Sequence, residues 1–153
     1  MRKSLFWILL LSCGLLFSLS AQEKGLGTGL IIGEPTGFSA KLWLDSQSAI
    51  DAALAYSLAE PEFNLRFHAD YLLHFLNILP EVVEGMNGYA GLGAYVLVGQ
   101  ENFQLGLRVP CGLVWFFKKV PLDLFLEVAP GMQILMSTKF TIGGGLGLRW
   151  FFN

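Results

Sequence analysis

Charged side chains are scarce in this chain of 153 residues, and the scarcity excludes several classes of protein. Only 14% of the residues are charged and 54% are hydrophobic, whereas soluble proteins carry roughly 25% charged residues. A soluble β-protein of this size needs more charge on its surface. Beyond residue 20 the sequence also lacks any run of ~18 apolar residues, so its hydrophobic residues do not form membrane-spanning helices.

Cysteine and positive charge are also in short supply. The chain has two cysteines, and because Cys13 lies in an apolar leader, Cys111 is left without a partner for an internal disulfide. Cys111 lies on an apolar face and is expected to act as a small hydrophobic residue. The net charge falls from −2 to −4 once Arg2 and Lys3 are removed with the leader, which argues against nucleic acid as a partner.

The N-terminus has the three parts of a secretory signal peptide. Arg2 and Lys3 precede an apolar run, Leu5–Leu19, and small residues precede a cleavage point before Ala21. We therefore predict a signal peptide over residues 1–20 and a single domain over residues 21–153. The alternatives are a lipoprotein signal, in which Cys13 is acylated, and a retained membrane anchor.

Alternation of apolar and polar residues dominates the mature chain. From Phe63 to Phe75, every second residue is apolar and the residues between them are mostly polar, which predicts a strand with two unlike faces. Eight such strands are expected, at Gly25–Gly33, Gly37–Asp45, Ala49–Leu58, Glu62–Phe75, Gly88–Gly99, Phe103–Phe117, Leu122–Ala129 and Phe140–Phe152. Turn residues separate them, and no second domain remains. At most one helical turn fits, within Asn77–Met86, and Pro110 predicts a bulge or a local break.

The fold class predicted from this pattern is an eight-stranded antiparallel up-and-down barrel. Alternation alone does not distinguish a transmembrane barrel from a soluble barrel with its apolar face inside. We favour the transmembrane form because the polar faces are rich in glycine and carry scattered charges of both signs. The apolar faces also carry more large residues than a narrow eight-stranded interior can hold.

Several sequence strings resemble a known family. They are IIGEPTGFSAKLWL (Ile31–Leu44), HADYLLHF (His68–Phe75), GLRVPCGL (Gly106–Leu113), PLDLFLEVAP (Pro121–Pro130) and GGGLGLRWFF (Gly143–Phe152). Together they are similar to small, uncharacterised OmpA-like outer-membrane β-barrel proteins of spirochaetes and other diderm bacteria. The resemblance implies an eight-stranded barrel in the outer membrane, with both termini in the periplasm, and it implies no reaction. One departure is that the longest connection, Leu76–Asn87, then falls on the periplasmic side and the external loops are short, which weakens an adhesin role.

The charged residues of the strands are expected to face the lumen. The predicted network consists of Lys41, Asp51, Arg66, His68, Asp70, Arg108, Asp123, Glu127 and Arg149, with Asp45 on the same faces. Buried charges must be paired, so we expect salt bridges between Arg108 and Asp123 or Glu127, and between Arg149 and Glu127. An ion pathway or a ligand site is the alternative.

The two histidines are too far apart to share a metal ion. His68 and His74 stand six residues apart on one strand, or ~20 Å, and no metal or cofactor is expected. His68 and Asp70 could form half of a catalytic pair, with Ser39 or Ser57 as the nucleophile. This alternative makes the protein a lipid-modifying enzyme of the outer membrane.

The first and last strands carry rows of glycine and meet when the sheet closes. Gly25, Gly27 and Gly29 are expected beside Gly143, Gly145 and Gly147, as a wall without side chains. This wall makes room for Trp43, Tyr89, Tyr95 and the arginines from across the lumen, or forms a groove for an acyl chain or small ligand.

The C-terminal strand completes the functional prediction. Its alternation ends in Trp150 and Phe152, which suit an interfacial aromatic girdle and recognition by the barrel assembly machinery. We expect a monomeric, closed barrel in contact with outer-membrane lipid, with a structural or surface-interaction role. The alternatives are a lipid-modifying enzyme and a narrow channel for small solutes.

Overall fold

The computed structural model describes residues 25–57, 64–75, 84–99, 103–135 and 137–152. The predicted signal peptide, with Cys13 and its lipoprotein alternative, lies outside these residues, as does most of Asn77–Met86. Among the described residues, no helix is both long enough and apolar enough to cross a membrane.

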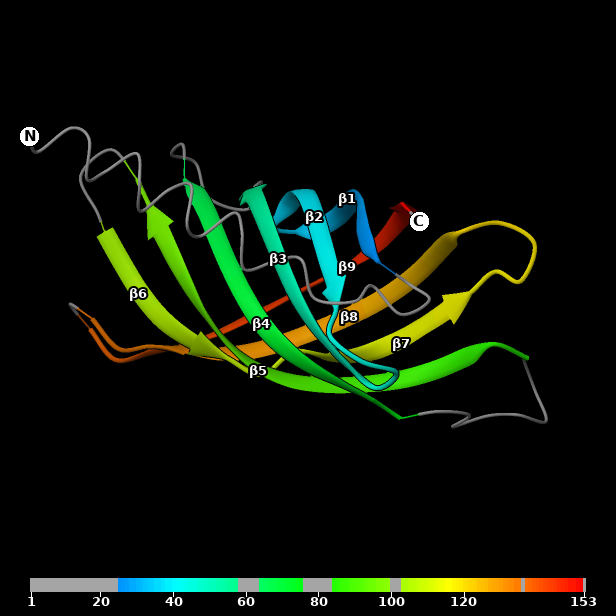
Figure 1. Ribbon diagram of the computed structural model, residues 1–153. Coiled ribbons are helices and arrows are strands. Elements are labelled where there is room, and N and C mark those ends of the chain that lie inside the picture. Colours follow the sequence, from blue (N-terminus) through cyan, green and yellow to red (C-terminus); the bar gives the residue numbers. More distant parts are fainter. Residues whose placement is uncertain (1–24, 58–63, 76–83, 100–102, 136, 153) are drawn as a thin grey trace, which may run out of the picture.

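Strands make up nearly all of the described chain (Figure 1). Their bounds are β1 Leu26–Glu34, β2 Thr36–Trp43, β3 Ser48–Tyr56, β4 Leu65–Phe75, β5 Met86–Val98, β6 Phe103–Arg108, β7 Cys111–Phe116, β8 Leu122–Gln133 and β9 Lys139–Phe152. Both β6 and β7 pair with β5 on one side and with β8 on the other. They are therefore two halves of one strand, and the barrel has the eight strands that the sequence predicts.

The sheet closes on itself through antiparallel pairs. With β6 and β7 counted as one strand, each strand pairs with the next along the chain, and β1 also pairs with β9, from Leu26↔Phe152 to Glu34↔Gly144. Closure leaves no free edge. The connections alternate between the two ends of the barrel, so the start of β1 and the end of β9 lie at the same end as the connection between β4 and β5.

Pro110 causes the break between β6 and β7, as expected. Proline cannot donate to a strand ladder, and the strand is interrupted at Val109 and Pro110. The neighbouring backbone groups remain satisfied, because the N–H of Gly91 donates to the carbonyl of Pro110 at 2.8 Å and that of Val109 donates to the carbonyl of Pro130 at 2.8 Å. The barrel therefore tolerates the proline without losing closure.

Some predicted strand bounds are wrong. The seventh predicted strand ends at Ala129, whereas β8 continues to Gln133 through Pro130, because β9 offers it partners as far as Gln133↔Lys139. Strand β4 begins at Leu65 rather than Glu62, and β5 begins at Met86 rather than Gly88. Gly85 precedes β5 with a φ of 89°, a left-handed conformation that favours glycine.

The apolar faces point outward on every strand. Ile32 and Phe38 are each 70% exposed and Phe140 is 68% exposed, whereas Lys41, Asp123 and Arg149 are fully buried. A soluble barrel requires the opposite arrangement. The soluble alternative is therefore wrong, and the exterior is that of a barrel surrounded by lipid.

Candidate functional site

Cross-strand register places a row of polar residues around the inside of the barrel. Lys41 of β2 pairs with Asp51 of β3, and Asp51 pairs with Asp70 of β4. Gly93 of β5 separates Asp70 from Arg108 of β6. These four charged side chains are all at least nine-tenths buried. Because paired residues point to the same face, the register alone brings them into one layer of the lumen.

Arg149 of β9 is the centre of one ion-pair group. Its Nε lies 3.2 Å from Oδ1 of Asp123, and its Nη1 donates to Oδ1 of Asp51 on the other side. The same Nη1 lies 3.5 Å from Oγ of Ser39. The guanidinium carbon also stands 3.8 Å from the centre of the Phe125 ring. Arg149 thus connects β9 to β2, β3 and β8 through the interior.

Arg108 is the centre of a second group. It donates through Nη2 to Glu127, and its Nε lies 3.4 Å from Oδ1 of Asp70. The hydroxyl of Tyr89 donates to the other oxygen of Glu127 at 2.9 Å. The Arg108–Glu127 pair is one of the two that the sequence suggested. Among the described residues, Arg149 pairs with Asp51 and Asp123 instead of the expected Glu127.

The other two predicted lumenal cations lie over aromatic rings. Lys41 Nζ stands 4.6 Å from the centre of the Trp43 ring and 2.7 Å from Nε2 of His74. Arg66 lies 4.0 Å from the centre of the Tyr95 ring. Contacts of this kind stabilise a cation through the negative face of the ring. The sequence indicated that these residues face inward but gave no sign of their ring partners.

Asp45 does not belong to the lumen, contrary to expectation. Strand β2 ends at Trp43, so the alternation that placed Asp45 inside stops before it. Asp45 is exposed in the turn that follows, where its side chain accepts hydrogen bonds from Ser48 Oγ and from the N–H groups of Gln47 and Ser48. These bonds, that of the Ser48 hydroxyl first, lower the pKa of the Asp45 carboxyl.

His68 and Asp70 point into the lumen together, but neither candidate serine is engaged with them. His68 Nε2 lies 3.7 Å from Oδ2 of Asp70, and both residues are 2% exposed. The hydroxyl of Ser39 faces Arg149, and that of Ser57 donates to Glu34. A serine–histidine–aspartate arrangement is therefore not assembled among the described residues.

Glycines inside the barrel lie opposite aromatic rings. Four rings have a glycine as their direct cross-strand partner, in the pairs Phe151↔Gly27, Tyr95↔Gly106, Tyr89↔Gly112 and Phe125↔Gly147. A Cβ at any of these glycines would come within 2.8 Å of an atom of the facing ring. Of the two glycine rows on the first and last strands, only Gly27 and Gly147 face a ring, and each ring belongs to an adjacent strand. The expected wall is wrong in its register, because Gly29 lies opposite Arg149 and Gly145 lies opposite Gly33.

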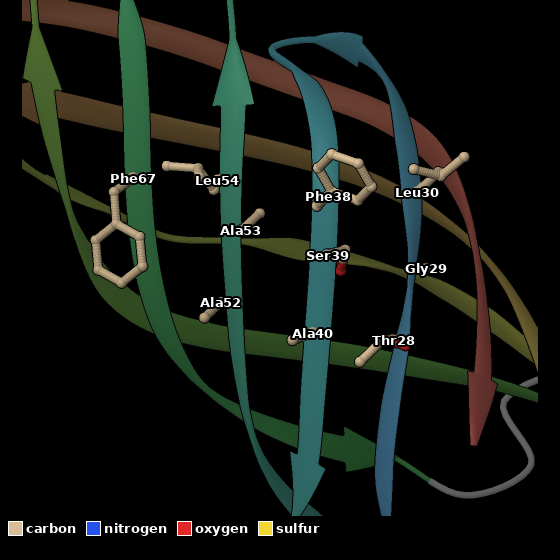
Figure 2. A pocket seen from close by; sticks show the side chains of 10 residues that line it. All are labelled: Thr28, Gly29, Leu30, Phe38, Ser39, Ala40, Ala52, Ala53, Leu54 and Phe67. Carbon is tan, nitrogen blue, oxygen red and sulfur yellow. The ribbon is translucent and has the colours of Figure 1, made fainter. Parts of the chain in front are cut away.

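A shallow groove of about 600 Å³ lies on the outer surface of β1 to β4 (Figure 2). Thr28, Ala40 and Ala52 form a low strip beside larger residues. Figure 2 shows Leu30, Phe38, Leu54 and Phe67 along one side of that strip, and β1, β2 and β3 hold the small residues as cross-strand partners. The groove is almost wholly apolar and faces outward, so acyl chains of the surrounding lipid suit it.

Comparison with known proteins identifies the fold. No family model and no curated protein sequence matches the chain. Among solved structures, the N-terminal β-barrel domain of OprF from Pseudomonas aeruginosa matches with a TM-score of 0.68 at 13% identity, over 85% of this chain and 98% of that domain. Neisserial surface protein A (NspA) matches with a TM-score of 0.50 at 15% identity, over 83% of this chain and 94% of that one.

The chain has the fold of an eight-stranded transmembrane β-barrel. This likeness to OprF and NspA establishes the architecture that the sequence predicted. At such low identity, no residue role is carried over from either structure.

Proposed function

We propose that this chain is a small, monomeric integral protein of a bacterial outer membrane, with a closed lumen and a structural or surface-interaction role. The observation that carries the proposal is the reversal of polarity between the two sides of the sheet. Large apolar residues cover the exterior, while Lys41, Asp123 and Arg149 are fully buried. A β-barrel with this arrangement is stable only when acyl chains surround it.

Three sequence features support the outer membrane as the location. The first is the predicted signal peptide over residues 1–20, which would direct the chain across the inner membrane. The second is β9, whose outward Trp150 and Phe152 suit recognition by the barrel assembly machinery. The third is the resemblance of the GEPTG and PLDLFLE strings to a family of small outer-membrane barrels.

The short connections favour a structural role over adhesion. At the end of the barrel opposite the start of β1 and the end of β9, β1 and β2 are joined by a turn in which Thr36 Oγ1 contacts both the N–H and the carbonyl of Gly33. Residues 134–138 alone join β8 to β9 at that end. If the termini lie in the periplasm, these connections face outside and offer little surface to a partner.

A closed lumen follows from the side chains that fill it. Arg149 reaches across the lumen from β9 to Asp51 of β3, and Arg108 of β6 joins Asp70 of β4 to Glu127 of β8. Four rings pack against glycines of adjacent strands. Eight-stranded barrels have interiors just wide enough for their own side chains. A continuous water-filled path is therefore not expected.

Conductance in a planar lipid bilayer tests the closed lumen. The purified protein should give traces indistinguishable from bare lipid, whereas a variant with Arg149→Ala and Arg108→Ala should leak more than the parent because both bridges are lost. Stable single-channel steps from the unmodified protein would contradict a closed lumen and favour the narrow-channel alternative.

A further inference from the structure

Asp51, His68 and Asp70 form a compact cluster on two neighbouring strands. Asp51 of β3 is the direct cross-strand partner of Asp70 of β4, and His68 precedes Asp70 by two residues on the same face. All three are at most 3% exposed. One ligand atom from each lies within 4.8 Å of the other two. Two carboxylates placed directly opposite each other repel, so the cluster needs a compensating positive charge.

Arg108 and Arg149 compensate for part of this charge. Among the described residues, Arg149 pairs with Asp51 and Asp123, and Arg108 pairs with Asp70 and Glu127. These two arginines therefore share four carboxylates. If Asp51 and Asp70 also bind a metal ion, Arg149 still has Asp123 as a partner and Arg108 still has Glu127. Lys41, the direct cross-strand partner of Asp51, and Arg66, which acts electrostatically on Asp70, supply two further positive charges. In the part of the chain that the structure describes, the four cations of the lumen therefore balance its four carboxylates, and the case for a metal ion rests on unsatisfied ligand atoms.

Unsatisfied polar atoms point to a missing ligand at the same place. Neither oxygen of the Asp70 carboxylate accepts a hydrogen bond from a described residue. Buried polar groups in folded proteins are nearly always bonded, and an unbonded one marks an ion, a water or a strained site. Asp70 Oδ1 faces Arg108 at 3.4 Å, which leaves Oδ2 directed towards His68.

We propose that Asp51, His68 and Asp70 bind a divalent transition-metal ion inside the barrel, with Zn²⁺ as the preferred ion. One imidazole nitrogen and two carboxylate oxygens are ligands that Zn²⁺ accepts at ~2.0–2.2 Å, usually in tetrahedral geometry. The 3.7 Å between His68 Nε2 and Asp70 Oδ2 is close to the spacing of two ligands around such an ion. Arg108 and Arg149 would then hold the outer oxygens of the two carboxylates and orient them towards the metal.

Metal content of the folded protein tests the site. The protein is purified from membranes in detergent and unfolded in urea in the presence of a chelator. It is then refolded with one equivalent of Zn²⁺ and passed through a desalting column. Elemental analysis should find about one Zn²⁺ per chain, as expected for a single site with three protein ligands and water in the fourth position. Refolding with Co²⁺ should give the visible absorption of a tetrahedral ion.

Two substitutions locate the metal, and a third controls for general effects. His68→Gln and Asp70→Asn should each abolish stoichiometric Zn²⁺ and the Co²⁺ spectrum. His74→Gln should retain both, because that histidine lies against Lys41 and Trp43 on the same face of β4. A heat-modifiable shift on a semi-native gel verifies that each variant is folded, and Asp70→Asn, which keeps the shape of the side chain, serves if His68→Gln fails to fold.

Two results would overturn the proposal. One is a folded parent protein that holds no stoichiometric Zn²⁺ or Co²⁺. That result would mean that the arginines, a shared proton or ordered water stabilise the facing carboxylates of Asp51 and Asp70. The other is metal binding that survives in both folded variants. Neither result bears on the location or the closed lumen proposed above, since conductance and membrane insertion are measured separately.

Discussion

At the scale of single residues, Arg149 holds several strands together from inside the lumen. It is fully buried and pairs with Asp51 and Asp123 while it lies over the Phe125 ring. Removing one partner of a buried ion pair leaves an uncompensated charge, which costs more than the pair itself contributes.

We therefore expect Arg149→Met to destabilise the barrel by about 3–5 kcal/mol. Methionine keeps much of the side-chain volume but leaves the two aspartates without their cation. Urea unfolding in detergent micelles, followed by tryptophan fluorescence, measures the change. Lys118→Met is the matched control, since Lys118 pairs with Glu84 on the surface and an exposed pair contributes within about 1 kcal/mol. Equal losses for the two variants would contradict the buried bridge.

The pairing of glycines with aromatic rings gives a second prediction. A Cβ at Gly147 would stand 2.1 Å from Cζ of Phe125, so Gly147→Ala should destabilise the barrel by about 1–3 kcal/mol through overpacking. Phe125→Leu in the same chain removes the distal ring atoms and should recover part of the loss. A double-mutant cycle by urea unfolding measures this coupling. Strictly additive effects would show that the ring and the glycine do not interact.

The sequence predicts the direction of these side chains better than their partners. Alternation placed Arg108 and Arg149 inside, because a period of two fixes the face of each strand residue. Partner choice depends on register and on the reach of a long side chain across the lumen, which alternation does not contain. Asp45 shows the other limit, because it follows the end of β2 and its direction is set by a turn.

At the scale of strands, the sequence predicts the effect of Pro110 correctly but not that of Pro130. Pro110 was expected to break its strand and does so. The predicted strand Leu122–Ala129 ends just before Pro130, yet β8 continues to Gln133 because β9 supplies partners on one side and β6 on the other. The sequence shows that a proline has no backbone N–H to donate to a strand ladder. It does not show whether the neighbouring strand needs a hydrogen bond from that position.

The outward face of a strand gives the third prediction. Leu146 is 51% exposed in the middle of β9, where it faces Leu126 of β8. Leu146→Arg should destabilise the barrel in bilayers by about 2–4 kcal/mol, because a charge near the midplane must leave water. Val120→Arg, in the turn between β7 and β8, should cost at most about 1 kcal/mol near the interface. Unfolding of both variants in lipid vesicles measures the difference, and equal costs would place Leu146 outside the hydrocarbon core.

At the scale of the whole molecule, composition and alternation were enough to predict the architecture. Low charge, the absence of apolar runs after the leader and the period of two led to a closed eight-stranded barrel with its apolar side outward, and the structure has that form. The candidate metal site was not foreseen. Spacing along one strand excluded a site shared by His68 and His74, whereas Asp51 reaches His68 only through the pairing of β3 with β4.

Quenching of single tryptophans by brominated lipid tests the orientation of the sheet most directly. Trp150 is 46% exposed on the outer face, and Trp43 is 7% exposed inside. Two leader-free proteins are placed in bilayers with brominated acyl chains, one keeping Trp150 (Trp43→Phe, Trp115→Phe) and the other keeping Trp43 (Trp115→Phe, Trp150→Phe). The outward apolar surface predicts that Trp150 loses most of its fluorescence and Trp43 keeps most of it. Stronger quenching of Trp43 than of Trp150 would contradict an exterior in contact with lipid.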